Sequence, residues 1–367
     1  MMKIAIIPWD KNIKENSIFC EKYPGYVDSH ILLKRAFESI QIELNTIDVY
    51  KDLSEVDCFL FFTLDYVWIN RVMKCGLLNR TIYCSGEPSV VKPENSEEGY
   101  KKLLKIFSFI LTWNEDLVDN KKIFIRNIPY YFVKDYGEVA FDQKKLLTNI
   151  SGNKRSKQPR ELYSERERVI SFFEQYRPDE FDLYGVGWDV AVHPSYRGTA
   201  ASKMKTYHNY KFALSLENTY GVKGYITEKI LDCFVAGIVP IYKGASDINN
   251  YIPKECYIDY DDFHSLADMA NYLENMSEEK YNEYLNNIDK FLDSAAIEKF
   301  SSQTFCEDIC AVIKEIGTEK KQISLTVWIK VKVGEISERW SSFSMQLRKK
   351  AKRFLIGCFQ RGKIEGV

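Results

Sequence analysis

The sequence predicts an α/β protein with two doubly wound, Rossmann-like domains that face each other across a cleft, followed by an amphipathic helical tail. Two series of short apolar runs alternate with helix-like stretches, one before about residue 132 and one after about residue 165. The 367 residues also exceed the usual size of one domain. We expect the domains to span residues 1–150 and 151–325, and the tail residues 326–367.

The first series contains strand-like runs with a helical pattern between the first two. Residues at helical spacing are Leu32, Leu33, Ala36, Phe37 and Ile40. The predicted strands are Ile4 to Ile7, Phe59 to Phe62, Thr81 to Cys84, Phe109 to Thr112 and Ile123 to Ile125. This alternation indicates a mostly parallel sheet covered by helices on both faces. Residues 134–163 are polar and lack periodicity, so we interpret them as the connection between the domains.

The second series has the same character. Its predicted elements are a helix around Glu167 to Tyr176, strands at Phe181 to Tyr184, Phe212 to Leu216 and Val239 to Tyr242, and a helix from Thr227. Helical stretches near residues 263–275 and 301–315 are expected to close this second domain. Such a pair of doubly wound domains encloses a ligand cleft at the carboxyl ends of its strands.

The bulk composition is that of a globular protein. Hydrophobic residues make up 45% and charged residues 28% of the chain, and the net charge of −1 disfavours a nucleic-acid binder. The nine cysteines are an odd number without a CxxC pair, which is typical of a reduced, cytosolic protein. The start of the chain lacks the pattern of an export signal, and no apolar run approaches the length of a membrane span. We therefore expect a cytoplasmic protein whose membrane contact is peripheral.

The segment from Tyr210 to Pro253 carries the most informative chemistry. Glu217 and Asn218 follow an apolar strand at its carboxyl end, where open α/β sheets place ligand-binding groups. Thr227 is a good N-cap, so Glu228 and Lys229 fall in the first turn of a helix. The positive end of that helix and the Lys229 ammonium suit a diphosphate, while the Glu228 carboxylate suits ribose hydroxyls.

The motifs of this segment are YKFxLxxEN, GYxTEKIxDxFxAGxVPIYxG and a following DI with YIP. Together they resemble the donor motif of the α1,3/4-fucosyltransferase family, whose members are inverting, GDP-fucose-dependent enzymes of GT-B type. The resemblance implies that Glu217 and Asn218 line the donor pocket with Tyr225 and Thr227, that Glu228 binds the fucose or the ribose, and that Lys229 contacts the phosphates. The segment departs from the family at Leu216 and Lys243, which affects the packing around the substrates.

A further donor contact is expected from the segment ELYSERERVISFFEQY, which resembles a family helix that directs an arginine at the diphosphate. Arg166 fits this role by its place after YSE. Arg168 is the alternative and would lie about 200° around the same helix. Without the resemblance, the segment reads as a charged surface helix with Glu and Arg pairs.

Asp259 and Asp261 in the sequence DYDDF have the DxD spacing that holds a divalent ion in other glycosyltransferases. We interpret them instead as a strand-to-helix turn with Asp262 as an N-cap. The four histidines show no metal-ligand spacing. We therefore expect neither a catalytic metal nor another cofactor.

Inverting transfer needs a base that removes the proton of the acceptor hydroxyl. Glu87, in the sequence IYCSGEPSV, follows a predicted strand at its carboxyl end, where the cleft should lie. The resemblance also implies a base after such a strand. The alternatives are Asp10 and Asp28.

The tail is basic, since residues 326–367 carry a net charge of +7 while the remainder carries −8. One helical face collects apolar residues and the flank collects cations: Trp340, Phe343, Leu347, Ala351, Phe354, Leu355 and Cys358, with Arg348, Lys349, Lys352 and Arg353. This pattern is typical of an interfacial helix, so we expect residues 340–363 to contact an anionic membrane at the cytoplasmic face of a bacterial inner membrane. The alternatives are packing on the two domains or on a partner in a homodimer.

The leading hypothesis is an α1,3-fucosyltransferase that moves fucose from GDP-fucose to O3 of GlcNAc in a bacterial lipopolysaccharide or Lewis-type glycan. The resemblance implies an acceptor that is N-acetyllactosamine-like or lipid-linked. One alternative is a GT-B enzyme that uses another nucleotide sugar, because phosphate contacts do not specify the sugar. The other is a noncatalytic glycan-binding protein.

Overall fold

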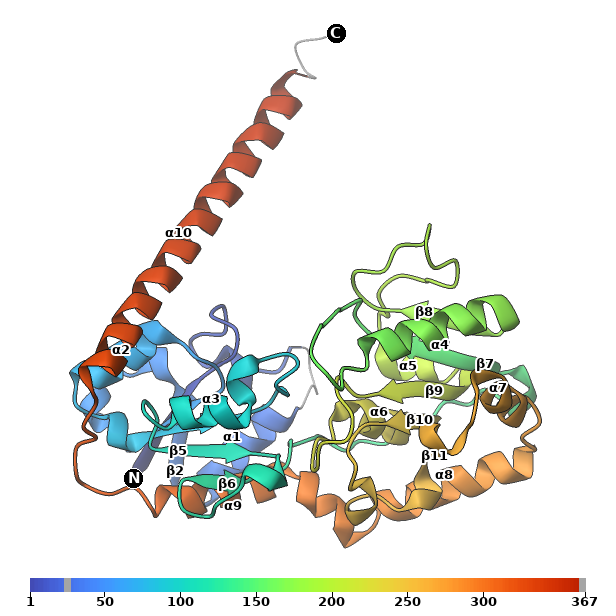
Figure 1. Cartoon of the computed structure of the whole chain (residues 1–367), viewed down its shortest axis with the longest axis horizontal. Helices are drawn as coiled ribbons and strands as arrows, with labels where there is room; N and C mark the ends of the chain where they lie inside the picture. Colours follow the sequence, from blue (N-terminus) through green and yellow to red (C-terminus); the bar gives the residue numbers. More distant parts are fainter. Residues whose placement is uncertain (23–27, 363–367) are drawn as a thin grey trace.

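The computed structural model describes residues 1–22 and 28–362 of the chain, with side chains up to residue 345. Two parallel sheets, each covered by helices, lie side by side, and one long helix extends away from the body of the molecule (Figure 1). The predicted fold class of two doubly wound α/β domains is confirmed.

The first sheet has the strand order β2-β1-β3-β4-β5-β6, and all its strand pairs are parallel. The strands are β1 (Met2–Ile7), β2 (Ile42–Thr46), β3 (Cys58–Phe61), β4 (Thr81–Cys84), β5 (Phe109–Thr112) and β6 (Ile123–Ile125). The edge strand β2 was not predicted, because its five residues, IELNT, form no sustained apolar run. Since β1 lies between β2 and β3, the strand order reverses between β1 and β3, which makes this position the switch point of the sheet.

Helices α1 (Ser29–Ser39), α2 (Tyr66–Lys74) and α3 (Glu97–Leu103) follow strands of the first sheet and cover its faces. Each begins at a side-chain cap. The carboxylate of Asp28, for example, accepts hydrogen bonds from the backbone amides of His30 and Ile31. Asp28, an alternative candidate for the base, is therefore the N-cap of α1.

Helix α9 (Ser302–Ile313) returns to the first domain, so the expectation that residues 301–315 close the second domain is wrong. Phe305 and Ile309 of this helix are buried in the same cluster as Ile4 and Leu33. The apolar face of α9 predicts a helix that packs on a sheet, but it does not specify which sheet. The first domain is thus built from two separate parts of the chain.

The predicted tail forms one helix, α10 (Leu325–Gly362). Val327 and Val331 near its start are buried against α2, and the Asn70 amide donates a hydrogen bond of 2.6 Å to Glu335. Beyond this docked part, α10 projects from the first domain (Figure 1). The predicted apolar and basic side chains from Leu347 to Cys358 lie outside the described side chains. Within the described residues, no helix combines the length and apolar character that crossing a bilayer requires.

The second sheet has the order β11-β10-β9-β7-β8, again with parallel pairs throughout. Its strands are β7 (Lys145–Ile150), β8 (Phe181–Tyr184), β9 (Tyr210–Leu216), β10 (Val239–Lys243) and β11 (Ile258–Asp259). The helices are α4 (Tyr163–Tyr176), α5 (Lys203–Tyr207), α6 (Glu228–Ala236), α7 (Leu266–Glu274) and α8 (Glu278–Leu292). The helix predicted within residues 263–275 packs on this sheet as expected. The switch point of the second sheet lies between β7 and β9.

Strand β7 lies inside the segment that the sequence predicted to be a connection, and before the boundary expected at residue 150. Its sequence, KLLTNI, contains polar residues that are nevertheless buried, because their side chains are satisfied by neighbouring strands. The Thr148 hydroxyl donates to the carbonyl of Asp182, and the Asn149 amide donates to the carbonyl of Leu214. These six residues therefore form a strand despite their polar composition.

The chain passes between the domains twice. The first crossing lies between β6 and β7, and the second leads from α8 to α9. The backbone amide of Tyr130 in the first crossing donates a hydrogen bond of 2.8 Å to the carbonyl of Phe300 in the second. The two crossings thus run beside each other at the junction.

Candidate active site

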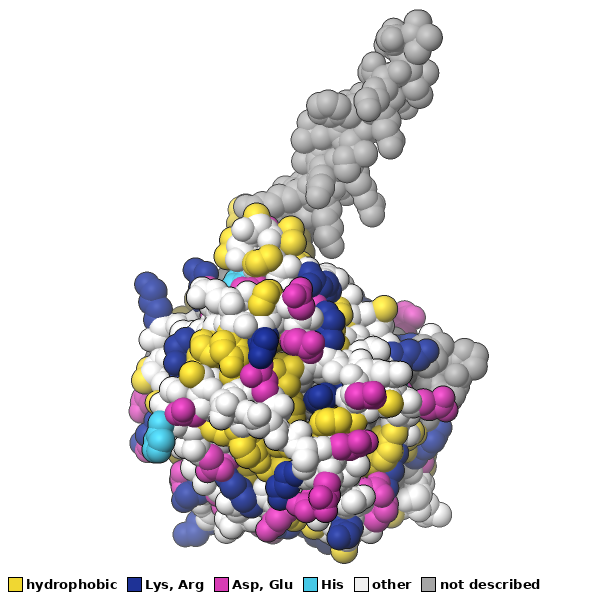
Figure 2. Space-filling view, turned by 90° about the vertical axis from the view of Figure 1, so that its right-hand side faces the viewer, with side chains coloured by type: hydrophobic (Ala, Val, Ile, Leu, Met, Phe, Trp, Pro, Cys, Tyr) yellow, Lys and Arg dark blue, Asp and Glu magenta, His cyan; other side chains and the backbone are white. Residues whose placement is uncertain are grey.

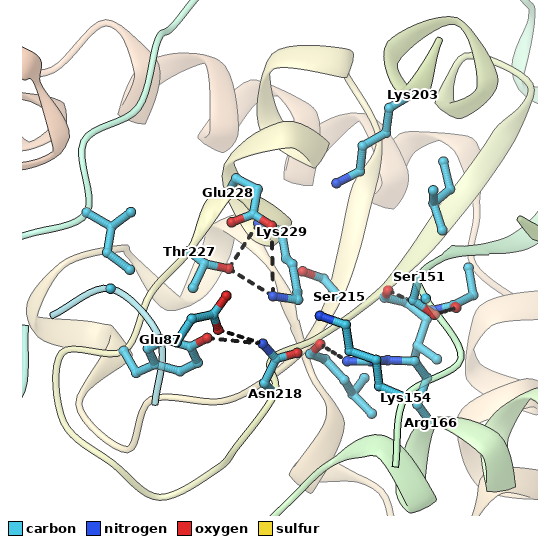
Figure 3. A pocket seen from close by; sticks show the side chains of 18 of the residues that line it. Glu87, Ser151, Lys154, Arg166, Lys203, Ser215, Asn218, Thr227, Glu228 and Lys229 are labelled. Atoms are coloured by element: carbon cyan, nitrogen blue, oxygen red, sulfur yellow. Dashed lines mark hydrogen bonds and ion pairs between the residues drawn. The ribbon is translucent and has the colours of Figure 1, made fainter. Parts of the chain in front are cut away.

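A cavity of about 630 Å³ opens between the carboxyl edges of the two sheets. Side chains from both domains line it, as expected for a site at two facing switch points. Of the residues predicted from the sequence, seven contribute to the lining: Glu87, Arg166, Asn218, Tyr225, Thr227, Glu228 and Lys229. Figure 3 shows Glu87 on one side of this cavity and Arg166 on the other, with Lys229 between them.

The loop that carries Glu87 begins where β4 ends and is held by side chains from three other elements. Arg126 donates to the carbonyl of Ser85 at 2.6 Å, Trp113 to that of Gly86 at 2.9 Å and Asn95 to that of Glu87 at 2.6 Å. Three successive carbonyls are thereby fixed, which restricts the backbone of the loop. The Glu87 carboxylate is placed by a rigid support rather than by a free turn.

The carboxylate of Glu87 faces the second domain. Its Oε2 lies 3.5 Å from the amide nitrogen of Asn218, and the same nitrogen lies 3.3 Å from the Tyr225 hydroxyl (Figure 3). The Tyr225 ring in turn contacts the Trp113 ring, with centroids 4.6 Å apart. The candidate base of the first domain and the candidate donor groups of the second therefore share one cavity.

Glu217 was predicted to line the cavity, and this prediction is wrong. Its side chain is fully buried behind the residues that line the cavity. Its carboxylate accepts hydrogen bonds from the backbone amide and hydroxyl of Thr227, each at 2.9 Å, and from the Lys229 ammonium at 3.0 Å. A buried carboxylate requires such partners. Glu217 thus holds the start of α6 and orients Lys229 from behind.

The charges at the start of α6 stabilise one another. Burial lowers the pKa of Lys229, but the carboxylates of Glu217 and Glu228 more than offset this effect, so its pKa is raised. Burial raises the pKa of Glu228, yet the ammonium groups of Lys229 and Lys203 bring it below its usual value. Burial raises the pKa of Glu217. Lys229 therefore stays a cation beside the amino end of a helix, which is a suitable place for a phosphate.

Arg166 projects from α4 into the cavity and is almost completely buried. Its guanidinium donates to the carbonyls of Leu216 at 2.7 Å and Glu217 at 3.1 Å, both at the end of β9. Arg168 lies on the other side of α4, where it bonds Glu165 and the hydroxyl of Tyr260. The helical rotation that the sequence indicated thus directs Arg166 to the cavity and Arg168 away from it.

The predicted contact of Arg166 with the donor phosphates is tested by replacing Arg166 with Met, which we expect to weaken GDP-fucose binding by at least about tenfold through loss of a charge-assisted hydrogen bond. Arg168→Met is the matched control, since it removes the same charge from the same helix outside the cavity. Isothermal titration calorimetry measures both constants. Equal affinities in the two variants would contradict a role for Arg166 at the diphosphate.

Sequence reasoning missed three lysines that line the cavity, Lys92, Lys154 and Lys203, of which Figure 3 labels Lys154 and Lys203. Lys203 begins α5 and its ammonium bonds the carboxylate of Asp232, which also accepts a hydrogen bond from Tyr130. No motif in the sequence marked Lys203. Lys154 belongs to the basic run NKRSKQPR, which was visible but was interpreted as part of a linker.

The carboxylates with DxD spacing form hydrogen bonds with lysine side chains. Asp259 bonds the Lys254 ammonium at 2.7 Å, and Asp261 bonds Lys243. Asp262 also pairs with Lys254 and caps no helix, so the predicted N-cap is wrong: Ser265 caps α7 instead. Across residues 1–22 and 28–345, no group of three or more His, Cys, Asp or Glu side chains is arranged to hold a metal.

Asp10 was the other alternative for the base. Its carboxylate accepts hydrogen bonds from the backbone and side chain of Asn12 and does not line the cavity. With Asp28 at the cap of α1, Glu87 is the carboxylate among the three candidates that reaches the cavity.

Solved structures with the same two-domain arrangement are known. A crystal structure of an α1,3-fucosyltransferase with GDP aligns over 88% of this chain and 92% of that chain, with a TM-score of 0.54 and 14% identity. The structure of Anabaena HepE in complex with UDP-glucose gives a TM-score of 0.51 at 8% identity, covering 86% of this chain and 100% of that chain. At these identities the likeness concerns the fold.

Sequence comparison gives closer relatives over shorter segments. An α-(1,4)-fucosyltransferase of Arabidopsis thaliana is 38% identical over 78 residues, which cover 21% of this chain and 19% of the relative. The mouse protein 4-galactosyl-N-acetylglucosaminide 3-α-L-fucosyltransferase 9 is 33% identical over 143 residues, which cover 36% of this chain and 38% of the relative. The matched segments thus span less than two fifths of these curated relatives.

Two parallel α/β domains with a cation-lined cavity between their carboxyl edges define the GT-B class of fold. The sequence profile of glycosyltransferase family 10 (fucosyltransferase), C-terminal part, matches residues 142–330. The chain belongs to glycosyltransferase family 10, the fucosyltransferases, which confirms the family indicated by the donor motif.

Proposed function

We propose that the protein transfers L-fucose from GDP-β-L-fucose to a glycan hydroxyl, O3 of GlcNAc, with inversion at the anomeric carbon. One observation carries the proposal: the Glu87 carboxylate of the first domain and the Arg166 and Lys229 cations of the second line the same cavity. Family membership and the names of the curated relatives support fucose as the sugar and a GlcNAc-containing acceptor.

The second domain would bind the donor. The diphosphate would lie against the amino end of α6, with Lys229 and Arg166 beside it, and Glu228 would accept hydrogen bonds from ribose or fucose hydroxyls. When the bond from fucose to the β-phosphate breaks, negative charge grows on the departing GDP. The two cations are already in place for that charge, so they stabilise the transition state more than the ground state.

The first domain would activate the acceptor. The Glu87 carboxylate takes the proton of the acceptor hydroxyl while the oxygen attacks the anomeric carbon from the face opposite GDP. A β-linked donor then gives an α-linked product. Asn218, whose amide lies 3.5 Å from Glu87, would orient this carboxylate.

The proposed reaction needs no bound metal or other cofactor. Charge stabilisation is assigned to Arg166, Lys229 and the amino end of α6. The carboxylates with DxD spacing support this proposal, because Asp259 and Asp261 already bond lysine side chains.

The donor is tested by titrating the protein with GDP-fucose, GDP-mannose and UDP-glucose in a calorimeter. We expect GDP-fucose to bind most tightly and to be turned over to GDP when N-acetyllactosamine is present, with an α1,3-linked product on analysis by NMR. Preference for UDP-glucose would favour a different nucleotide-sugar transferase. Binding of glycans without any hydrolysis of GDP-fucose would favour a noncatalytic glycan-binding protein.

We further propose that α10 attaches the enzyme to the anionic inner face of a bacterial cytoplasmic membrane through residues 340–363, close to lipid-linked acceptors. The described part of this segment exposes large apolar side chains, with Trp340 71% and Phe343 54% accessible. Apolar side chains gather where α10 leaves the body of the molecule (Figure 2). The net charge of +7 on residues 326–367 provides attraction to anionic lipids.

The membrane proposal is tested by sedimentation with vesicles of phosphatidylglycerol and phosphatidylcholine. The protein should be shortened after Arg339, because Val327 and Val331 belong to the core and Glu335 bonds Asn70. We expect the full chain to sediment with anionic vesicles and the shortened chain to stay in the supernatant. Equal partitioning would contradict membrane binding, and a change from dimer to monomer on shortening would favour the homodimer.

A further inference from the structure

Among the described residues of the first domain, three neighbouring aromatic rings at and beside the cavity have no part in the proposed chemistry. The Trp9 ring lies 5.0 Å from the His30 ring and 6.4 Å from the Phe62 ring, and the His30 and Phe62 rings are 6.5 Å apart, all measured between centroids. Trp9 and Phe62 line the same cavity as Glu87. We call these three residues the aromatic corner.

The aromatic corner sits at the switch point of the first sheet. Trp9 comes two residues after β1, and Phe62 directly follows β3. These are the two neighbouring strands between which the strand order reverses. In an open α/β sheet, the crevice outside the carboxyl ends of such strands is where a ligand binds. Each domain thus presents its own switch point to the cavity, and the second is already assigned to the donor.

The aromatic corner is held in place by contacts with α9 and, through α9, with Arg126. The Phe62 ring contacts Phe305 of α9 with centroids 6.3 Å apart, and the Arg126 guanidinium lies 4.9 Å from the centroid of that ring. Arg126 is the same residue that holds the Ser85 carbonyl beneath the Glu87 loop. The aromatic corner and the candidate base therefore share one support, so their relative position is fixed by the fold.

The side chain of Trp9 is about half exposed where it lines the cavity. A tryptophan with 49% of its surface accessible forgoes much of the stabilisation that burial of its ring would give. Burial lowers the pKa of His30, whose ring lies beside Trp9. The aromatic rings of Trp9 and Phe62, in the same cavity as the Glu87 carboxylate, suit a ligand with one apolar face and hydroxyls at its edge.

We propose that Trp9 and Phe62 form the acceptor subsite and bind the C–H face of a pyranose ring, whose hydroxyl then points to Glu87. The inference rests on the proposed function and adds to it the residues that hold the acceptor sugar. A pyranose has an apolar face that packs on an aromatic ring, while the hydroxyls on its rim remain free for hydrogen bonds. Trp9 supplies the larger ring for this contact, and the Phe62 ring lies beside it.

The inference is tested with Trp9→Ala, with Trp9→Phe as the conservative variant and Trp328→Ala as the matched control. Trp328 is 44% exposed on α10 and does not line the cavity. With N-acetyllactosamine as the probe, we expect Trp9→Ala to raise the acceptor KM at least about tenfold, and Trp9→Phe to restore most of the loss. The KM for GDP-fucose and its slow hydrolysis without acceptor should not change in any of the three variants.

A second measurement does not depend on turnover. Tryptophan fluorescence is recorded while N-acetyllactosamine, methyl β-D-galactoside or methyl β-D-N-acetylglucosaminide is added in the presence of GDP. The wild-type protein has six tryptophans, so the difference between its titration and that of Trp9→Phe isolates Trp9. A sugar-dependent signal that disappears in Trp9→Phe supports the subsite.

The outcomes separate the inference from the proposed function. If the wild type neither binds nor hydrolyses GDP-fucose, the proposed function fails first. If it does both, an unchanged acceptor KM in Trp9→Ala overturns the inference alone. An absence of any Trp9-dependent signal with all three sugars also overturns it, as does a signal produced by GDP itself, which would place the nucleotide against Trp9.

Discussion

Replacing Glu87 with Gln is expected to slow fucosyl transfer by about 10²- to 10⁴-fold, the usual contribution of a general base. The amide keeps the size of the side chain but cannot accept the proton of the acceptor hydroxyl. GDP-fucose binding should remain, because the cations that we propose bind the donor diphosphate come from the second domain. Single-turnover transfer to N-acetyllactosamine and calorimetry with GDP-fucose measure the two effects on the same sample.

Asp10→Asn is the matched control for this experiment. It removes a carboxylate from the first domain that bonds only nearby groups of Asn12 in the described structure and stays outside the cavity. We expect its transfer rate to stay within about twofold of the wild type. Rapid transfer by Glu87→Gln, or a large loss in Asp10→Asn, would assign the base to another group.

The second large effect is expected at Lys229. Its ammonium lies beside the amino end of α6 and is oriented by the buried Glu217. In the proposed mechanism Lys229 is one of two cations that stabilise the growing charge on GDP, so we expect Lys229→Met to reduce kcat by about 10²- to 10³-fold. Rapid chemical quench with saturating GDP-fucose measures this step.

The folding of that variant needs a control, because Lys229→Met leaves the Glu217 carboxylate buried without its cation. Breaking a buried ion pair from one side costs about 3–5 kcal/mol. The double variant Lys229→Met with Glu217→Gln removes the stranded charge and should recover much of the thermal stability. If activity returned together with stability, Lys229 would be a structural residue rather than a partner of the phosphates.

The parts of the fold that the sequence predicted are those where local pattern and burial coincide. The apolar runs of β1, β3, β4 and β5 are buried strands, and all four were predicted within a residue or two. The donor segment was equally clear, because its residues occupy the end of β9 and the start of α6. Local sequence therefore specified both the strands and the ligand-binding edge of the second sheet.

What the sequence could not reveal depends on distant partners. Thr148 and Asn149 of β7 look like loop residues until Asp182 and Leu214 provide their hydrogen-bond acceptors. Glu217 looked like a ligand-binding carboxylate because nothing local shows that Thr227 and Lys229 enclose it. The aromatic corner combines residues that follow two separate strands with a residue of α1, and only the strand order places them together.

The position of α9 determines the order in which the two cores can be completed. The second domain is continuous in the chain from β7 to α8, so all of its sheet and main helices are made before residue 293. The first sheet, although synthesised earlier, lacks the cover that Phe305 and Ile309 give to one of its faces until α9 has left the ribosome. The core of the first domain can therefore be completed only after the second domain has been synthesised, although N-terminal domains generally fold first during synthesis. The domain that carries Glu87 is therefore completed by a helix that is synthesised after the second domain.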